Sequence, residues 1–321
     1  MLRWIALTVL LAAGCGSSPP PEAAEPAPEP GAEVGTLLSL VPPESTLILC
    51  ASPSELLASE PTAHVVRAIF PATRLDRFAA RTGVDPRLLD ELILAEHPHG
   101  RFAIARGPID AIFAVREAGE RMAPIESSSD APLFRRAGFL GESRTEVVAL
   151  SEDVILRVEG TPQLTAAILA IARVPPIART PAFDPSELEG HVDSPIALYA
   201  PHPLGLPADS GIGLLLAREE QMAASIRPEE DALRVTAEFT GEFPPESHEN
   251  FRSFAESIAA SDFGAALGAR DALPSLRIEA QDDRVRLSAT VDPHVLAAGL
   301  RAMLFAEIEE LIEGRRSAEM P

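Results

Sequence analysis

The sequence around His97 holds the densest group of side chains that could bind a metal. Glu96-His97-Pro98-His99 places two imidazoles two residues apart and next to a carboxylate. Imidazole and carboxylate are both zinc ligands, but a zinc site needs a third or fourth ligand, which would have to come from a distant part of the chain. The alternative is a polar turn, which Pro98 and Gly100 favour. His97 and His99 are therefore candidate metal ligands, and we expect no cofactor.

A second group could support nucleophilic catalysis. His191, Asp193 and Ser194 lie within four residues, but a catalytic triad normally converges from separated elements. The chain has no Gly-x-Ser-x-Gly, Ser-x-x-Lys or His-Glu-x-x-His motif and no phosphate-binding glycine loop, and all 27 of its basic residues are Arg. The segment is more typical of a loop that leads into a strand. The sequence therefore favours a protein without a catalytic site.

The N-terminus has the form of a secretory signal. A single basic residue, Arg3, precedes an apolar run over 5–13, and this run is too short to cross a bilayer as a helix. The run leads into Leu11-Ala12-Ala13-Gly14-Cys15, which resembles the lipobox of bacterial lipoproteins. This resemblance implies a signal peptide over 1–14 and lipidation of Cys15 by diacylglycerol and a fatty acid such as palmitate. The alternative is an ordinary signal that is cleaved at a nearby small residue.

The residues after the lipobox indicate where the anchored protein would go. Gly16 in place of Asp is compatible, by the same resemblance, with sorting to the outer membrane of the bacterial cell envelope. Residues 15–36 include the segment PPPEAAEPAPEP at 19–30. A stretch so rich in Pro and Glu cannot bury a core, and it predicts an extended tether. We therefore expect the membrane to be a partner through the N-terminal lipid.

The composition excludes some classes of ligand. The chain has 321 residues, 48 acidic side chains against 27 basic ones, and a net charge of -21. This balance argues against nucleic acid, which needs a cationic surface, and against adsorption to anionic lipid through basic residues. Hydrophobic residues make up 46% of the chain, which is enough to bury a core. Cys50, in an apolar run, has no disulfide partner once Cys15 carries lipid, and we expect it to be a buried small side chain.

The elements that must position these residues follow from capping and periodicity. Pro follows Ser, Thr, Asp or Gly at six candidate helix starts, where its missing N–H costs nothing. These starts are at Ser52-Pro53, Asp85-Pro86, Gly107-Pro108, Thr161-Pro162, Asp184-Pro185 and Asp292-Pro293. Strands are predicted over 45–51, 101–106, 134–139, 145–150 and 153–158, and over 195–200, 211–217, 222–227, 231–240, 274–280 and 284–290.

The two parts of the chain follow a similar order. Each opens with a strand after Pro, and each ends with a strand hairpin followed by a helix that starts at Pro. We predict an α+β fold of two related halves, with mostly antiparallel sheets covered on one face by helices. The expected units are 37–180 and 181–313, followed by a flexible tail over 314–321.

The body also has a resemblance of its own. Val41-Pro42-Pro43-Glu44-Ser45-Thr46 leads into a strand, Gly83-Val84-Asp85-Pro86 into a Leu-rich helix, and Gly107-Pro108-Ile109-Asp110 into another helix. This order resembles uncharacterised bacterial envelope proteins with tandem α+β repeats. The resemblance implies a fold and no reaction.

We therefore expect a lipid-anchored cell-envelope protein that binds or scaffolds an envelope protein partner without catalysis. One alternative is a carrier of a lipid or another apolar ligand, for which a cavity between the sheet and the helices would be needed. Another is a metal-dependent envelope hydrolase that uses His97 and His99.

Overall fold

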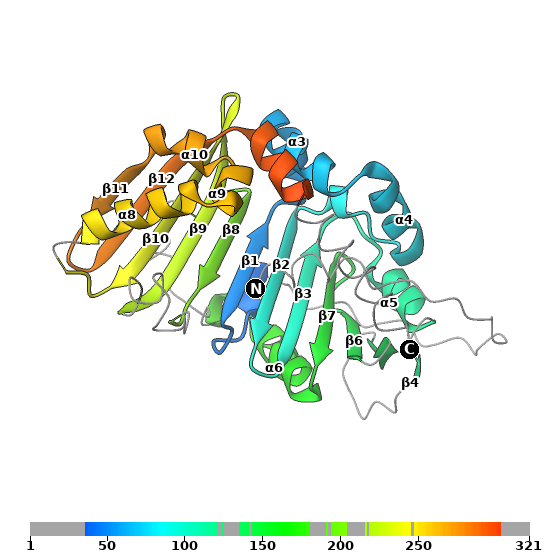
Figure 1. The fold of residues 1–321 in the computed structure, drawn as a ribbon. Helices are drawn as coiled ribbons and strands as arrows, with labels where there is room; N and C mark the ends of the chain where they lie inside the picture. The colour runs from blue at the N-terminus through cyan, green and yellow to red at the C-terminus, as the bar shows by residue number, and fades with distance from the viewer. Residues whose placement is uncertain are drawn as a thin grey trace, which may run out of the picture.

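Strand pairing dominates the architecture of the protein in its computed structural model. It describes residues 36–120, 123–124, 135–140, 143–179, 191, 194–203, 216, 218–244 and 247–302. In these residues, twelve strands form one antiparallel sheet in the order β11-β12-β10-β9-β8-β1-β2-β3-β7-β6-β5-β4 (Figure 1). The strands are β1 Leu47–Ala51, β2 Glu91–His97, β3 Gly100–Arg106, β4 Ala123–Pro124, β5 Arg135–Leu140, β6 Ser143–Ala149, β7 Val154–Gly160, β8 Ile196–Ala200, β9 Glu219–Glu229, β10 Ala232–Gly241, β11 Arg277–Ala280 and β12 Arg284–Val291.

The two halves of the sheet repeat one strand order. Outward from the central β1–β8 pair, one half runs β1-β2-β3-β7-β6 and the other runs β8-β9-β10-β12-β11. In chain order these are equivalent strands, so the expected α+β fold of related halves is present. The halves share one continuous sheet. The expected boundary at 180/181, the signal peptide 1–14, all of the tether except residue 36, and the tail 314–321 lie outside the described residues.

Helices connect the strands and cover the sheet. The helical segments are η1 Leu37–Leu40, α2 Pro53–Ala58, α3 Glu60–Ile69, α4 Ala72–Thr82, η2 Pro86–Leu88, α5 Ala111–Gly119, α6 Pro162–Arg173, η3 Pro176–Ala178, α8 Ser247–Ala260, α9 Asp262–Ala266, α10 Ala269–Ala272, η5 Leu273–Ser275 and residues 293–302. Two of the predicted caps form hydrogen bonds. The Asp85 carboxylate accepts one from the N–H of Arg87, and the Asp292 carboxylate accepts one from the N–H of His294. No described helix is long and apolar enough to cross a membrane.

We call the face of the sheet that carries α5 and α8 the front face, and the opposite face the back face. On the front, Ala111 and Val115 of α5 pack on the first half, while Phe251 of α8 packs on Ile278 and Val285 of the second half. Figure 1 shows α8, α9 and α10 lying over β10 and β12. On the back, Leu164 and Ile168 of α6 pack with η1 against the first half. The first half is thus covered on both faces.

A β-strand replaces one helix that the sequence predicts. The segment after Asp85-Pro86 makes only the 3-10 turn η2 and then the strand β2. Its consecutive apolar residues lie on opposite faces of the sheet, with Leu92 in the front core and Ile93 in the back core. A strand that is buried on both faces has no polar alternation, so it is hard to distinguish from a buried helix by pattern alone. Pairing with β1 and β3 decides the outcome.

A polar sheet face as the candidate binding surface

The predicted metal ligands lie at the turn between β2 and β3. His97 is buried and ends β2, while Pro98 and His99 form the turn. The Nδ1 atom of His97 accepts a hydrogen bond from the N–H of His99 at 3.1 Å, and its Nε2 atom lies 3.6 Å from a carboxylate oxygen of Glu44. Burial lowers the pKa of His97. Among the described residues, no three His, Cys, Asp or Glu side chains come together as a metal-binding group.

The segment at 191–194 leads to a different group of residues. His191 is fully buried, and its Nδ1 atom lies 2.9 Å from the Oγ atom of Ser225 on β9. The Oγ atom of Ser194 accepts a hydrogen bond from Nε of Arg227 at 2.6 Å. The two side chains thus engage β9, and Asp193 lies outside the described residues. Two of the three residues considered for a triad are instead part of a polar cluster on the sheet.

The cluster occupies the back face of the second half. Antiparallel pairing places Ser225, Thr236, Ser288 and Arg277 in one row across β9, β10, β12 and β11. The neighbouring row on one side is Arg227, Arg234 and Thr290. On the other side the row is Ala223, Glu238, Arg286 and Glu279. Because side chains alternate between the faces of a strand, all of these point to the same face.

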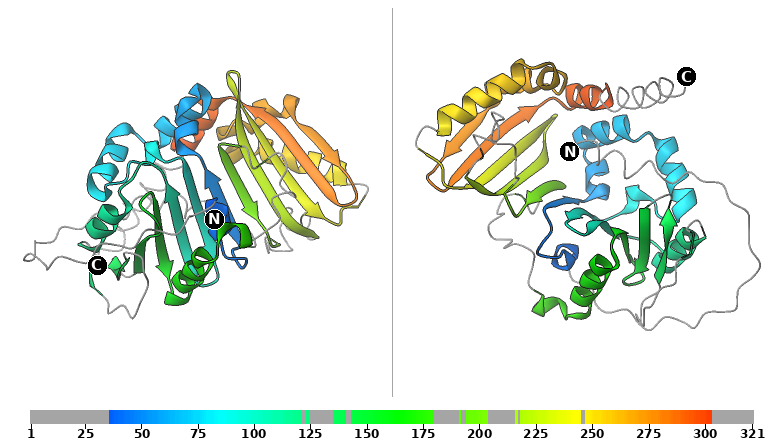
Figure 2. Two further views of the ribbon diagram at one scale, coloured as in Figure 1. Left: turned by 180° about the vertical axis from the view of Figure 1, so that it is seen from behind. Right: turned by 60° about the horizontal axis from the view of Figure 1, so that its bottom comes forward.

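The last of these rows continues into the first half of the sheet and becomes apolar there. Beyond Ala223 it runs through Tyr199, Ile48, Ala95, Phe102 and Val158 as far as β7, and it then meets the buried Glu146 on β6. These apolar residues belong to the core beneath α6. The helix that corresponds to α6 in the second half, residues 293–302, lies elsewhere: His294 Nδ1 is 3.0 Å from His64 Nε2 of α3. In the view from behind, no described helix lies over the back face of β9, β10, β12 and β11 (Figure 2).

Ion pairs organise the charged part of this face. Glu238 is 4% exposed, and its carboxylate lies 3.3 Å from Nη1 of Arg284 and 3.2 Å from Nε of Arg286. Arg234 makes a two-point contact with Glu229, with Nε to Oε2 at 2.9 Å and Nη2 to Oε1 at 2.7 Å. A buried carboxylate needs such partners, because burying a lone charge is very costly.

His191 is held neutral by this environment. Burial, together with the positive charges of Arg286 and Arg227, lowers its pKa from 6.5 to about 4. At neutral pH the imidazole therefore carries one proton and offers one donor and one acceptor. One nitrogen is used by Ser225, while the other, Nε2, is buried without a hydrogen-bond partner in the described part of the chain. The same is true of Nη2 of Arg227.

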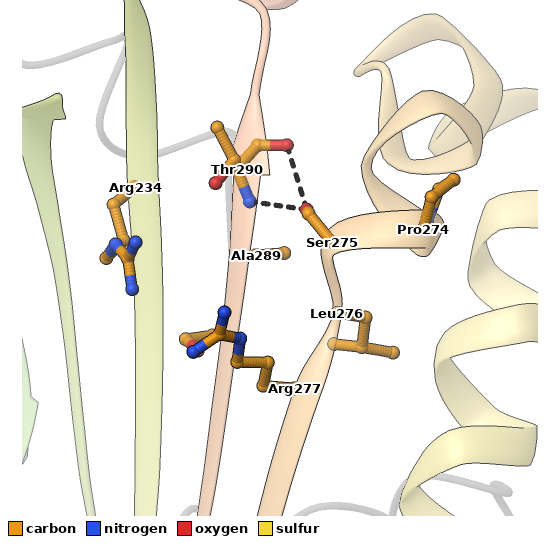
Figure 3. A pocket seen from close by; sticks show the side chains of 8 residues that line it. Arg234, Pro274, Ser275, Leu276, Arg277, Ala289 and Thr290 are labelled. Carbon is orange, nitrogen blue, oxygen red and sulfur yellow. Dashed lines mark hydrogen bonds between the residues drawn. The ribbon is translucent and has the colours of Figure 1, made fainter. Parts of the chain in front are cut away.

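A shallow cavity of about 180 Å³ opens at the outer edge of this face. Its polar lining comes from Arg234, Arg277, Ser288, Thr290 and Ser275 of η5, and its apolar lining from Pro274, Leu276 and Ala289. Figure 3 shows Arg234 and Arg277 extending from the two strands that flank β12, with Ser275 hydrogen-bonded to the backbone of Thr290. The N–H of Thr290 donates to Oγ of Ser275 at 2.8 Å. Guanidinium and hydroxyl groups around a shallow cavity suit a polar or anionic ligand better than an apolar one.

Cys50 takes no part in this surface. It is half-buried on β1 and packs against the core of the first half. Burial and the charge of Glu91 raise the pKa of its thiol to about 12. A thiol that stays protonated is a poor nucleophile, so the expected structural role of Cys50 agrees with its surroundings.

Comparisons with known proteins agree on the fold. No protein-family model and no curated protein sequence matches the chain. Among solved structures, crystal form III of TP0453 matches with a TM-score of 0.51 at 12% identity, covering 83% of this chain and 97% of that one. Crystal form IV of TP0453 gives a TM-score of 0.50 at 12% identity and covers 86% and 97%. The two proteins share an overall α+β fold.

Proposed function

We propose that this protein is a lipid-anchored, non-catalytic binding protein of the bacterial cell envelope. Its binding surface is the polar back face of β9, β10, β12 and β11. The observation that carries this proposal is the contrast between the two halves on the back of the sheet. The first half fills this face with apolar side chains and covers it with α6, whereas the second half places paired charges and hydroxyls there.

Two further observations support the location. The Leu11-Ala12-Ala13-Gly14-Cys15 sequence resembles a lipidation signal, and the following Pro-rich residues would separate the body from the membrane. Cys15 would carry the acyl chains, and two or three chains are enough for stable anchoring. Outer-membrane sorting is part of the proposal and rests on Gly16.

The anchor is tested by labelling living cells with an alkyne analogue of palmitate. We expect the wild-type protein to take up label and to sediment with membranes, and the Cys15→Ser variant to lose both properties. Cys50→Ser is the matched control, because it removes the other cysteine and should change neither result. Label or membrane association that persists in Cys15→Ser would refute the anchor. Separation of inner and outer membranes then tests the sorting.

The binding surface is tested with a photo-reactive amino acid in intact cells. The benzophenone side chain replaces Glu279, which is exposed on β11 beside Arg286 on the polar face, or Glu256, which is exposed on α8 over the front face. After irradiation, mass spectrometry of the purified protein detects protein or small-molecule adducts. We expect a defined adduct from position 279 and none from position 256. No adduct at position 279, or the same adducts at both positions, would argue against this surface.

A further inference from the structure

The central row of the polar face is a row of hydroxyls with arginines around it. Ser225, Thr236 and Ser288 are adjacent across β9, β10 and β12, and Arg277 closes the row on β11. Neighbouring strands are about 4.8 Å apart, and residues two apart on one strand are about 7 Å apart. A small group bound over Thr236 and Ser288 is therefore within reach of Arg234 on one side and Arg286 on the other.

One pair of arginines on this face is unfavourable in the free protein. Arg227 and Arg234 are direct cross-strand partners, and like charges at such positions repel. Glu229 neutralises Arg234, whereas the guanidinium of Arg227 donates a hydrogen bond to the neutral Oγ of Ser194. Over the three rows, four arginines stand against two glutamates, and the flanking Glu229 and Arg284 add one charge of each sign, so that the excess of two positive charges is kept. The face is thus locally positive in a chain whose net charge is -21.

Two buried polar atoms beside the row also lack partners. Nε2 of the fully buried His191 and Nη2 of Arg227 have no hydrogen-bond partner among the described residues. Nδ1 of His191 contacts Ser225, so the imidazole lies next to the row. A buried polar atom without a partner costs free energy, and such atoms are typical of sites that await a ligand or water.

We propose that this site binds a phosphate-class dianion. In this arrangement Thr236 and Ser288 donate their hydroxyl protons to the phosphate oxygens, and the guanidinium groups of Arg227, Arg234 and Arg286 bind its charge. The excess of two positive charges on the three rows matches a dianion, and planar guanidinium forks suit tetrahedral oxyanions. The inference rests on the proposed binding function, for which it names the class of ligand.

The rest of the molecule limits what carries the phosphate. A long polyanion such as nucleic acid would extend beyond the site and meet the acidic remainder of the chain. A single phosphate group is small enough to stay within the site. That group belongs to a lipid headgroup or to a small soluble compound, and the two sources share the same recognition chemistry.

Two binding measurements on the Cys15→Ser protein, which lacks the anchor, test this site and separate the two sources. In the first, inorganic phosphate is titrated by isothermal calorimetry. In the second, the protein is sedimented with phosphatidylcholine vesicles that contain or lack phosphatidic acid. We expect binding to phosphate, to the phosphatidic acid vesicles, or to both, at low ionic strength. Phosphate binding alone points to a soluble compound, and vesicle binding points to a headgroup.

Three substitutions assign the binding to this face. Arg227→Ala and Thr236→Val are expected to weaken binding at least tenfold and threefold, respectively, because each removes donors to the anion. Arg252→Ala, an equal change of charge at an exposed position on α8, should weaken it less than twofold. Thermal unfolding shows whether each variant is folded. Thr236→Val keeps the side-chain shape, so it remains informative if Arg227→Ala does not fold.

Two results would overturn the inference. One is a wild-type protein that binds neither phosphate nor phosphatidic acid vesicles. The other is an Arg252→Ala variant that loses as much affinity as Arg227→Ala, since binding would then reflect overall charge. If the cross-linker at position 279 still captures a ligand, the binding function stands and the ligand belongs to another chemical class. If nothing is captured and phosphate does bind, the site exists and its role in the cell is refuted.

Discussion

The buried imidazole of His191 predicts a specific loss of stability in acid. In the folded protein its pKa is lowered from 6.5 to about 4 by burial and by the charges of Arg286 and Arg227. In the unfolded chain the same group titrates near 6.5. As the pH falls below 6.5, the unfolded state therefore takes up a proton that the folded state refuses, and unfolding becomes more favourable. The stabilising contribution is present above the unfolded pKa and is lost toward the folded one.

The size of this effect follows from the difference between the two pKa values. A separation of roughly 2.5 pH units at about 1.4 kcal/mol per unit corresponds to about 3 kcal/mol of unfolding free energy between pH 7 and pH 4. Other groups contribute over the same range. The pKa of Glu91 is raised by burial, which acts in the opposite direction, and the pKa of His97 is lowered, which acts in the same direction. The pH profile of the wild type alone is therefore not diagnostic.

The His191→Asn variant isolates the contribution. Asn can replace the Nδ1 contact to Ser225 and does not titrate. Urea unfolding at pH 7, 6, 5 and 4 is compared between the two proteins. We expect the wild type to lose about 3 kcal/mol more than the variant over this range. Nuclear magnetic resonance of the imidazole should give a midpoint near 4.

The reasoning would be refuted by parallel pH profiles of the two proteins or by an imidazole midpoint at or above 6.5. Either result would mean that the ring is hydrated or paired with a negative charge. The assignment of a neutral, buried imidazole among arginines would then be wrong, and the polar face would need a different electrostatic description.

Three further predictions concern the scaffold. Phe251→Ala should cost about 3–5 kcal/mol of unfolding free energy, because this 2% exposed ring joins α8 to the sheet, whereas Phe113→Ala, at a 48% exposed ring, should cost far less; equal urea midpoints would contradict this. Gly160→Ala should destabilise by at least about 2 kcal/mol, since its φ is +152° and a Cβ atom would lie 2.3 Å from the carbonyl oxygen of His99; an unchanged melting temperature would show that the strand adjusts. Cys50, the only thiol left in a Cys15→Ser chain, should not react with a thiol reagent at pH 8 until urea is added, and rapid labelling of the folded protein would mean that its pKa is not raised to about 12.

Local patterns in the sequence identify much of the scaffold. The predicted hairpins at 145–158 and at 275–290 correspond to β6–β7 and β11–β12, because alternation on either side of a polar turn is a short-range property. Asp110 caps α5 by accepting from the N–H of Phe113, three residues after the predicted Gly107-Pro108 start. The exception is β2, which was expected to be helical. Its apolar run is buried on both faces, so the choice depended on partners that are distant in sequence.

The candidate surface could be found only in part. His191 and Ser194 attract attention as possible catalytic residues, but their partners Ser225 and Arg227 lie more than thirty residues away. In the strand predicted over 284–290, polar residues alternate with apolar ones from Arg284 to Ser288, which is typical of a sheet with one polar face. It does not show that three neighbouring strands present their polar residues on that same face. The register of pairing decides this, because a shift by one residue would turn each set to the other side.

The sequence by itself determined the composition-dependent properties of this protein: enough apolar residues for a core, an acidic overall balance, a Pro-rich N-terminal segment and an α+β pattern in two related halves. These follow from local propensity and from averages over the chain. The tertiary structure decided where charge gathers. The overall charge of -21 argues against an anionic ligand, yet pairing of β9, β10, β12 and β11 brings four arginines together on a face without a described helix. Electrostatic recognition depends on local geometry, which no average over the sequence contains.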